Sequence, residues 1–183
     1  MIVYCFLKGT SGTFLAVIHG KVMKCYFYGS NLLPDKLAKN RGLISFAIPD
    51  YGVLFRSQYE GNRYECEYAA AIALIRFVQL NQEHFQGKAL KLLTDSPIVV
   101  YQVNNRIATT KTLQRFRDLI FFYMRKLNFE LVWVPANMNR ASTPVAEIGT
   151  NPQSPKFNYD IFDESTKRKI IHKPQNKSPI KVA

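Results

Sequence analysis

Acidic residues are scarce in this chain, and their scarcity is the first constraint on its function. Only 13 of the 183 residues are Asp or Glu, against 25 Lys or Arg, and the formal net charge is therefore +12. The positive surplus is present in residues 1–149 as well as in residues 150–183. A surface of this kind favours a polyanionic partner such as nucleic acid, although charge alone does not identify one.

Cysteine is rarer still, with Cys5, Cys25 and Cys66 as the whole set. The number is odd, and the sequence has no CxxC motif and no Cys/His cluster. Each cysteine lies inside an apolar or helical run, so we expect three reduced, buried thiols in an intracellular protein.

Long hydrophobic runs are missing too. The opening MIVYCFLKG is too short and too polar for a secretory signal, and no apolar stretch reaches the length of a membrane span. We therefore expect a soluble intracellular protein with no membrane partner. Nothing in the sequence separates a cytoplasmic from a nuclear location.

The apolar content is sufficient for a folded core: 47% of the residues are hydrophobic and 13% are aromatic. The length suits one domain, which we place at residues 1–149. From residue 150 onward Pro, Asn, Ser and Lys dominate, and residues 167–183 contain basic residues but no acid. We interpret residues 150–183 as a flexible basic tail.

Hydrophobic periodicity predicts an alternation of strands and helices along the domain. Strands are expected at 2–7, 13–18, 21–28, 89–94 and 129–134, and helices at 65–82, 97–104, 111–127 and from Thr143 onward. Residues 30–64 are interpreted as an irregular insertion with an extra strand or two. This order predicts an α/β fold, with a mixed sheet in which an antiparallel meander precedes parallel strands, flanked by helices.

Three segments carry a resemblance to a known family. Asp95 ends the apolar run in LLTDSPIVVYQVN, at the end of a strand where open α/β sheets place their chemistry. Glu67 opens the small-residue helix CEYAAAIAL, and VWVPANMNRAS follows later in the chain. In this order and spacing, the segments resemble the type 1 ribonuclease H fold over residues 1–149.

The resemblance implies a site with two metal ions held by four acids, which stabilises both the attacking and the leaving oxygen of a phosphodiester. Glu67 and Asp95 match two of these acids. Lys8 and Thr143 fall at the other two positions, and no acidic residue precedes Asp35. The sequence therefore predicts a degraded site and no cofactor, with Mg²⁺ or Mn²⁺ expected only if the protein is active.

Glu67 and Asp95 each have a second interpretation that involves no metal. Glu67 can lie in solvent near the start of its helix, where a negative charge interacts favourably with the helix dipole. Asp95 can cap the helix at 97–104, which is a common role for Asp before Ser-Pro.

Basic and polar residues suggest where a nucleic acid would bind. Lys, Arg and amide groups at the junction of the two middle helices suit phosphate oxygens, and a Gly-Thr-Ser-Gly turn suits the 2′-hydroxyls of RNA. The candidate contacts are Thr10, Ser11, Asn104, Asn105, Arg106, Lys111 and Arg115. The expected partner is RNA, an RNA–DNA hybrid or structured DNA.

Three functions remain open at this point. The preferred one is a nucleic-acid-binding ribonuclease H-like domain without catalysis. The alternative is an active metal-dependent nuclease that cuts RNA in RNA–DNA hybrids, with Glu65 or Glu147 as a third ligand. A second alternative is a protein-interaction scaffold that docks through the apolar stretch 43–55.

Overall fold

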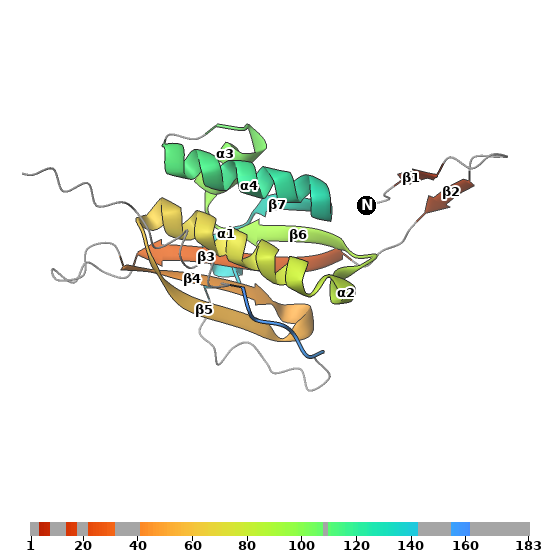
Figure 1. The fold of residues 1–183 in the computed structure, drawn as a ribbon, viewed down its shortest axis with the longest axis horizontal. Helices are drawn as coiled ribbons and strands as arrows, with labels where there is room; N and C mark the ends of the chain where they lie inside the picture. Colours follow the sequence, from red (N-terminus) through yellow and green to blue (C-terminus); the bar gives the residue numbers. More distant parts are fainter. Residues whose placement is uncertain are drawn as a thin grey trace, which may run out of the picture.

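The computed structural model describes residues 4–7, 14–17, 22–31, 41–107, 110–142 and 155–161. Their main body is a five-stranded mixed sheet with helices packed on it (Figure 1). Its strands are β3 (Val22–Asn31), β4 (Arg41–Ile48), β5 (Val53–Glu60), β6 (Ala89–Thr94) and β7 (Phe129–Trp133), in the spatial order β5-β4-β3-β6-β7. Two further strands, β1 (Tyr4–Leu7) and β2 (Phe14–Val17), pair antiparallel with each other as a separate two-stranded sheet.

The sheet combines both kinds of strand pairing. Strands β3, β4 and β5 form an antiparallel meander, whereas β6 pairs parallel with both β3 and β7. Helix α1 (Arg63–Leu80) connects the meander to the parallel half, and α3 (Pro97–Asn104) and α4 (Lys111–Leu127) connect β6 to β7. The α/β fold with a meander followed by parallel strands is confirmed.

The core lies between the sheet and α1. Alternate residues of β3, namely Met23, Cys25 and Phe27, are buried on the side that faces this helix. Helix α1 is rich in alanine where it meets the sheet, which lets the backbones approach closely. Gly29 marks the closest approach, because a Cβ built there would lie 2.3 Å from the backbone nitrogen of Glu67. The packing of α1 on β3 therefore fixes the position of Glu67.

Cys25 and Cys66 are both buried free thiols, as the sequence predicts. Burial is the main cause that raises the pKa of Cys25 to about 12 and that of Cys66 to about 11. Both groups are therefore protonated at neutral pH and serve as small core residues. Cys5 lies in β1.

Most predicted elements agree with the structure. Strand β6, α3 and α4 have the predicted bounds, while α1 and β7 differ from them by one or two residues. Asn62 and Glu65 form a capping box at the start of α1, where Glu65 accepts from the Asn62 backbone and Asn62 accepts from that of Glu65. None of the described helices is long and apolar enough to span a bilayer.

The extra strand or two expected within residues 30–64 are confirmed over 41–60, although the description of this stretch as an insertion is wrong. These residues form β4 and β5, two full strands of the main sheet. The meander is therefore β3-β4-β5, and the assignment of residues 2–7 to the first strand of the fold is also wrong. Several apolar runs near the start share the same alternation, and only pairing with both β4 and β6 identifies β3 as the central strand.

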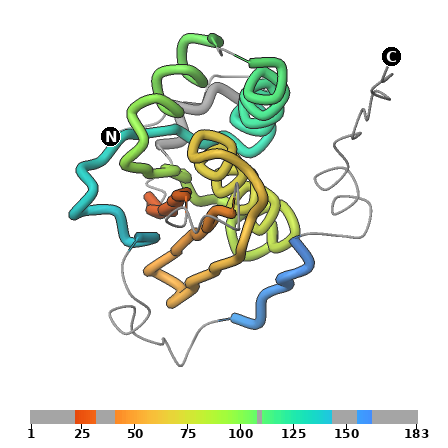
Figure 2. Tube along the Cα trace, turned by 90° about the vertical axis from the view of Figure 1, so that its left-hand side faces the viewer, coloured from red at the N-terminus to blue at the C-terminus, as the bar shows by residue number. Residues whose placement is uncertain are grey.

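The expected flexible tail contains a docked segment at residues 155–161 (Figure 2). The ring of Phe157 lies 5.2 Å from those of both Phe77 and Tyr51, and Ile161 is buried. The side chain of Asn81 also donates to the carbonyl of Asn158 and accepts from its backbone N–H. This part of the predicted tail therefore belongs to the folded body.

Candidate functional site

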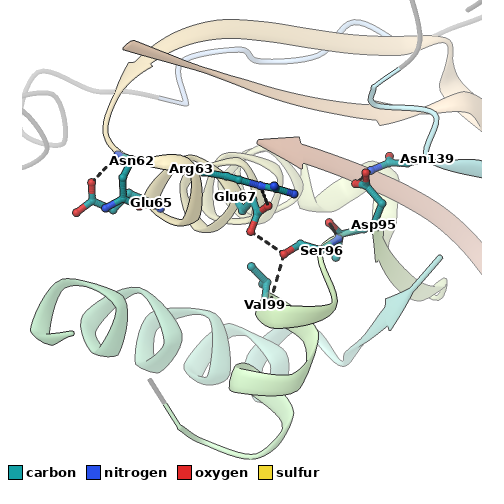
Figure 3. A network of polar contacts seen from close by, with 9 residues as sticks. Asn62, Arg63, Glu65, Glu67, Asp95, Ser96, Val99 and Asn139 are labelled. Atoms are coloured by element: carbon teal, nitrogen blue, oxygen red, sulfur yellow. Dashed lines mark hydrogen bonds and ion pairs between the residues drawn. The ribbon is translucent and has the colours of Figure 1, made fainter. Parts of the chain in front are cut away.

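The candidate site lies at the sheet edge where the parallel strands β3 and β6 have their carboxyl ends. Asp95 follows β6 directly, and Ser96 then begins α3. Glu67 reaches this edge from the first turns of α1, and Asn139 reaches it from the loop after the short 3-10 helix η2 (Ala136–Met138). Figure 3 shows Glu67 beside Ser96, with Asp95 and Asn139 in contact next to them. The structure thus brings together the two acids that the sequence singled out.

Glu67 is a buried carboxylate with hydrogen bonds to both of its oxygens. The Ser96 hydroxyl donates to Oε2 over 2.6 Å, and Arg63 Nε donates to Oε1 over 3.1 Å. Burial raises the pKa of Glu67, the two hydrogen bonds and the Arg63 charge oppose that rise, and the nearby Asp95 adds to it. The alternative in which Glu67 lies in solvent is wrong, since the residue is only 4% exposed.

Asp95 is half-buried and is held by an amide. Asn139 Nδ2 donates to Asp95 Oδ1 over 2.6 Å and to the backbone carbonyl of Phe27 over 3.0 Å. Asn139 itself is 1% exposed, and its own Oδ1 accepts from the backbone of Ala141. One buried amide therefore links the middle of β3 to the residue that follows β6. Asn139 was part of the VWVPANMNRAS motif, but nothing in the sequence indicated this role.

Asp95 is not the cap of α3. Ser96 holds the N-cap position, where its Oγ accepts from the backbone N–H of Val99 over 3.4 Å while its hydroxyl donates to Glu67. A single buried hydroxyl thus connects the start of α3 to the acid on α1. The cap interpretation of Asp95 is therefore wrong.

The resemblance implies an acid before the glycine of the first strand, and the sequence alone matches Lys8 to that place. In the structure the central strand is β3, where Tyr28 precedes Gly29. Gly29 packs against the backbone at Glu67. Tyr28 is half-buried and lies close enough to Arg63 to affect the pKa of the guanidinium. Lys8 itself lies outside the described residues.

Of the two candidate third ligands, Glu65 and Glu147, only Glu65 lies among the described residues. Glu65 is engaged in the capping box with Asn62. Thr143 and Glu147 lie outside the described residues. In the part of the chain that the structure describes, no group of three or more His, Cys, Asp or Glu residues is placed to hold a metal ion.

The candidate nucleic-acid contacts fall into two groups. Five of them lie exposed at the end of α3 and in the first turns of α4: Asn104, Asn105, Arg106, Lys111 and Arg115. Arg106 has a positive φ of 57°, its guanidinium lies 4.1 Å from the centre of the Phe121 ring, and its carbonyl accepts from Arg117. The other two, Thr10 and Ser11, lie outside the described residues.

The central meander, the parallel strands and the connecting helices define a ribonuclease H-like fold, and comparison with solved structures supports this class. The chain is similar to LC11-RNase H1, isolated from compost by a metagenomic approach, with a TM-score of 0.55 and 19% identity over 65% of this chain and 88% of that one. It is also similar to RNase H1 from Halobacterium salinarum NRC-1, with a TM-score of 0.51 and 20% identity over 65% and 90%.

A third similar structure is LC11-RNase H1 in complex with an RNA/DNA hybrid, with a TM-score of 0.53 and 17% identity over 64% of this chain and 88% of that one. No protein-family model and no curated protein matches the sequence. At this level of identity the likeness establishes the fold. The function must be argued from this chain's own residues.

Proposed function

We propose that this protein is a nucleic-acid-binding ribonuclease H-like domain that does not hydrolyse its ligand. The observation that carries the proposal is the exposed polar and basic junction between α3 and α4. It presents Arg106, Lys111 and Arg115 together with Asn104 and Asn105 on this fold. Guanidinium, ammonium and amide groups are the usual partners of phosphate oxygens.

The expected ligand is RNA, an RNA–DNA hybrid or structured DNA. One structure of similar fold holds an RNA/DNA hybrid, which makes a hybrid the natural first probe. The net charge of +12 supports a polyanionic ligand. Binding to phosphates implies an affinity that falls steeply with salt.

The geometry of the two acids supports the absence of hydrolysis. A two-ion mechanism needs several carboxylates that are free to hold cations. We assign Tyr28, which precedes Gly29 of the central strand, to the place of one acid. Both oxygens of Glu67 already accept hydrogen bonds from protein groups. The guanidinium of Arg63 also places a positive charge where a metal ion would have to approach. The described residues therefore do not fit a pair of metal ions.

A second candidate is an active nuclease dependent on Mg²⁺ or Mn²⁺. The observation in its favour is that Glu67 and Asp95 do lie at one edge and influence each other, since the charge of Asp95 contributes to the raised pKa of Glu67. Two carboxylates can bind one cation together with substrate oxygens and water.

The scaffold alternative loses the feature that suggested it. In the stretch 43–55 the side chains of Ile44, Phe46, Ile48 and Val53 are buried in the core and do not form an exposed docking edge. Protein partners therefore have no support from this stretch.

The test is a binding and cleavage assay with one labelled RNA–DNA hybrid, in EDTA and in Mn²⁺. We expect salt-sensitive binding without cleavage, both in the wild type and in Asp95→Asn. Metal-dependent cleavage that Asp95→Asn abolishes would instead establish the nuclease.

The binding surface is tested by two double variants on the same helix. Lys111→Gln with Arg115→Gln should lower the slope of log affinity against log salt by about two, since each lost phosphate contact removes roughly 0.9. Arg125→Gln with Lys126→Gln removes the same charge from the last turn of α4 and should leave the slope unchanged. Equal slopes for the two pairs would contradict the assigned surface.

A further inference from the structure

Arg63 and Glu67 form an unusual pair because they differ so strongly in burial. The side chain of Arg63 is 70% exposed, whereas that of Glu67 is only 5% exposed, yet Arg63 Nε lies 3.1 Å from Glu67 Oε1. Figure 3 shows the Arg63 side chain beside Glu67 at the candidate site. Its Nε is fixed on a buried anion, while most of the side chain is exposed to solvent.

Arg63 and Ser96 supply the positive charge and the hydrogen-bond donors that a metal cation would otherwise supply to Glu67. A buried carboxylate needs a positive partner or strong donors to remain charged, and here Arg63 and the Ser96 hydroxyl supply them. The hydrogen bond to Glu67 is the main cause that raises the pKa of Arg63, so the guanidinium keeps its charge throughout the accessible pH range.

The exposed part of the guanidinium has the chemistry of a phosphate ligand. Nε–H is used on Glu67, and the two terminal nitrogens carry four more N–H donors in a planar fork. Such a fork matches two oxygens of a phosphate, and the bond to Glu67 fixes its orientation before a ligand arrives.

We propose that Arg63, held on Glu67, binds a backbone phosphate of the nucleic acid at this edge and replaces a divalent metal ion as the cation there. The proposal rests on the proposed nucleic-acid binding and adds that Arg63 is the cation that this binding uses at the edge. Binding at this edge is consequently independent of Mg²⁺ and Mn²⁺. The competing explanation is an ordinary pair of residues four apart, which stabilises α1 only slightly.

The test measures binding of a labelled RNA–DNA hybrid to the full chain over a range of salt, in EDTA and in Mg²⁺. Arg63→Gln should weaken binding about tenfold or more, as expected for the loss of a charge-assisted bond, and should lower the salt slope by roughly 0.9. Both losses should be the same with and without metal. Arg125→Gln removes one exposed arginine from the last turn of α4 and serves as the matched control.

Glu67→Gln gives a second, independent readout. The amide keeps the shape of the side chain but removes the anion that orients Arg63, so binding should weaken, although less than in Arg63→Gln, which loses the guanidinium itself. Binding by Glu67→Gln that is as tight as that of the wild type, or tighter wild-type binding in Mg²⁺, would overturn the proposal. A thermal melt of each variant confirms that it is folded.

The two proposals fail in different ways. If the wild type does not bind the hybrid, RNA or structured DNA in a salt-dependent manner, the proposed function itself is wrong. If Lys111→Gln with Arg115→Gln weakens binding while Arg63→Gln behaves like Arg125→Gln, only the role of Arg63 is wrong.

Discussion

At the scale of the residue, Glu67 lies in a buried position that disfavours its negative charge, and two hydrogen-bond donors partly offset this effect. Burial disfavours its charge, and the donors Ser96 and Arg63 limit but do not cancel that effect, so its pKa stays above the ordinary value of 4.5. The folded state therefore holds this proton more tightly than the unfolded chain does. Its contribution to stability is complete below pH 4.5 and is lost as the pH rises through the folded-state pKa.

A pH series of Glu67→Gln measures this linkage. The free energy of unfolding of the variant, relative to the wild type, should increase between pH 4 and pH 7, because the amide does not lose a proton. Urea denaturation of both proteins at several pH values gives the difference and cancels the contributions of other groups. A relative stability that stays constant, or falls, over this range would show that burial does not raise the pKa of Glu67.

Ser96 provides a second prediction for a single residue. Ser96→Ala removes the cap of α3 and leaves Glu67 Oε2 without its donor, so we expect a loss of roughly 2–4 kcal/mol in the free energy of unfolding. Thr110→Ala removes a comparable cap from α4 at an exposed site and should cost only about 1 kcal/mol. Equal losses in urea denaturation would show that the bond to Glu67 contributes nothing to stability.

At the scale of the element, periodicity predicted β6, α3 and α4 because each has a clear apolar pattern and local boundary signals such as Pro97 or Thr110. The same reasoning misplaced the central strand. Alternation tells a strand from a helix, but it does not show which strands are neighbours. The match of Lys8 to the first acid rested on that assignment, because the place of the first acid depends on which strand is central.

Within the site, Glu67 and Asp95 were predictable because each stands beside a recognisable helix or strand boundary. The partners Arg63 and Asn139 were not. Their roles depend on side-chain contacts that form only after α1, β6 and η2 are packed. The contact of Phe157 with the core could not be predicted either, because its neighbours in sequence are polar and resemble those of a flexible tail.

The contact between β3 and α1 gives the sharpest prediction for an element. Gly29→Ala places a Cβ within 2.3 Å of backbone atoms of Cys66 and Glu67, which cannot move as a side chain can. We expect a loss at or above the roughly 1–3 kcal/mol typical of overpacking, with displacement of Glu67.

Gly87→Ala is the matched control for this substitution. Gly87 has a positive φ of 70° and no atom within 4 Å of the built Cβ, so its substitution should cost about 1–2 kcal/mol from backbone strain alone. Urea denaturation compares the two, and a smaller loss for Gly29→Ala than for Gly87→Ala would contradict the close packing.

At the scale of the whole molecule, the segment around Phe157 sets the boundary of the folded body. A chain that ends after Ile161 keeps every described contact and should unfold like the full chain. A chain that ends after Ser154 exposes the aromatic cluster of Tyr51, Phe77 and Phe85 and should lose roughly 2–4 kcal/mol. Identical urea midpoints for the two truncations would show that the segment does not contribute to stability.

The pairing of β3 with β6 also determines when the site can exist. Residues 22–26 of the central strand can pair with β6 only after residues 89–93 have been synthesised. The side-chain amide of Asn139, which joins β3 to Asp95, lies 112 positions after Phe27. During synthesis, the three strands of the meander can pair while the later part of the chain is still on the ribosome. The edge that holds Glu67 and Asp95 is completed only when Asn139 has emerged, so a nascent chain assembles this edge as one of the last steps of folding.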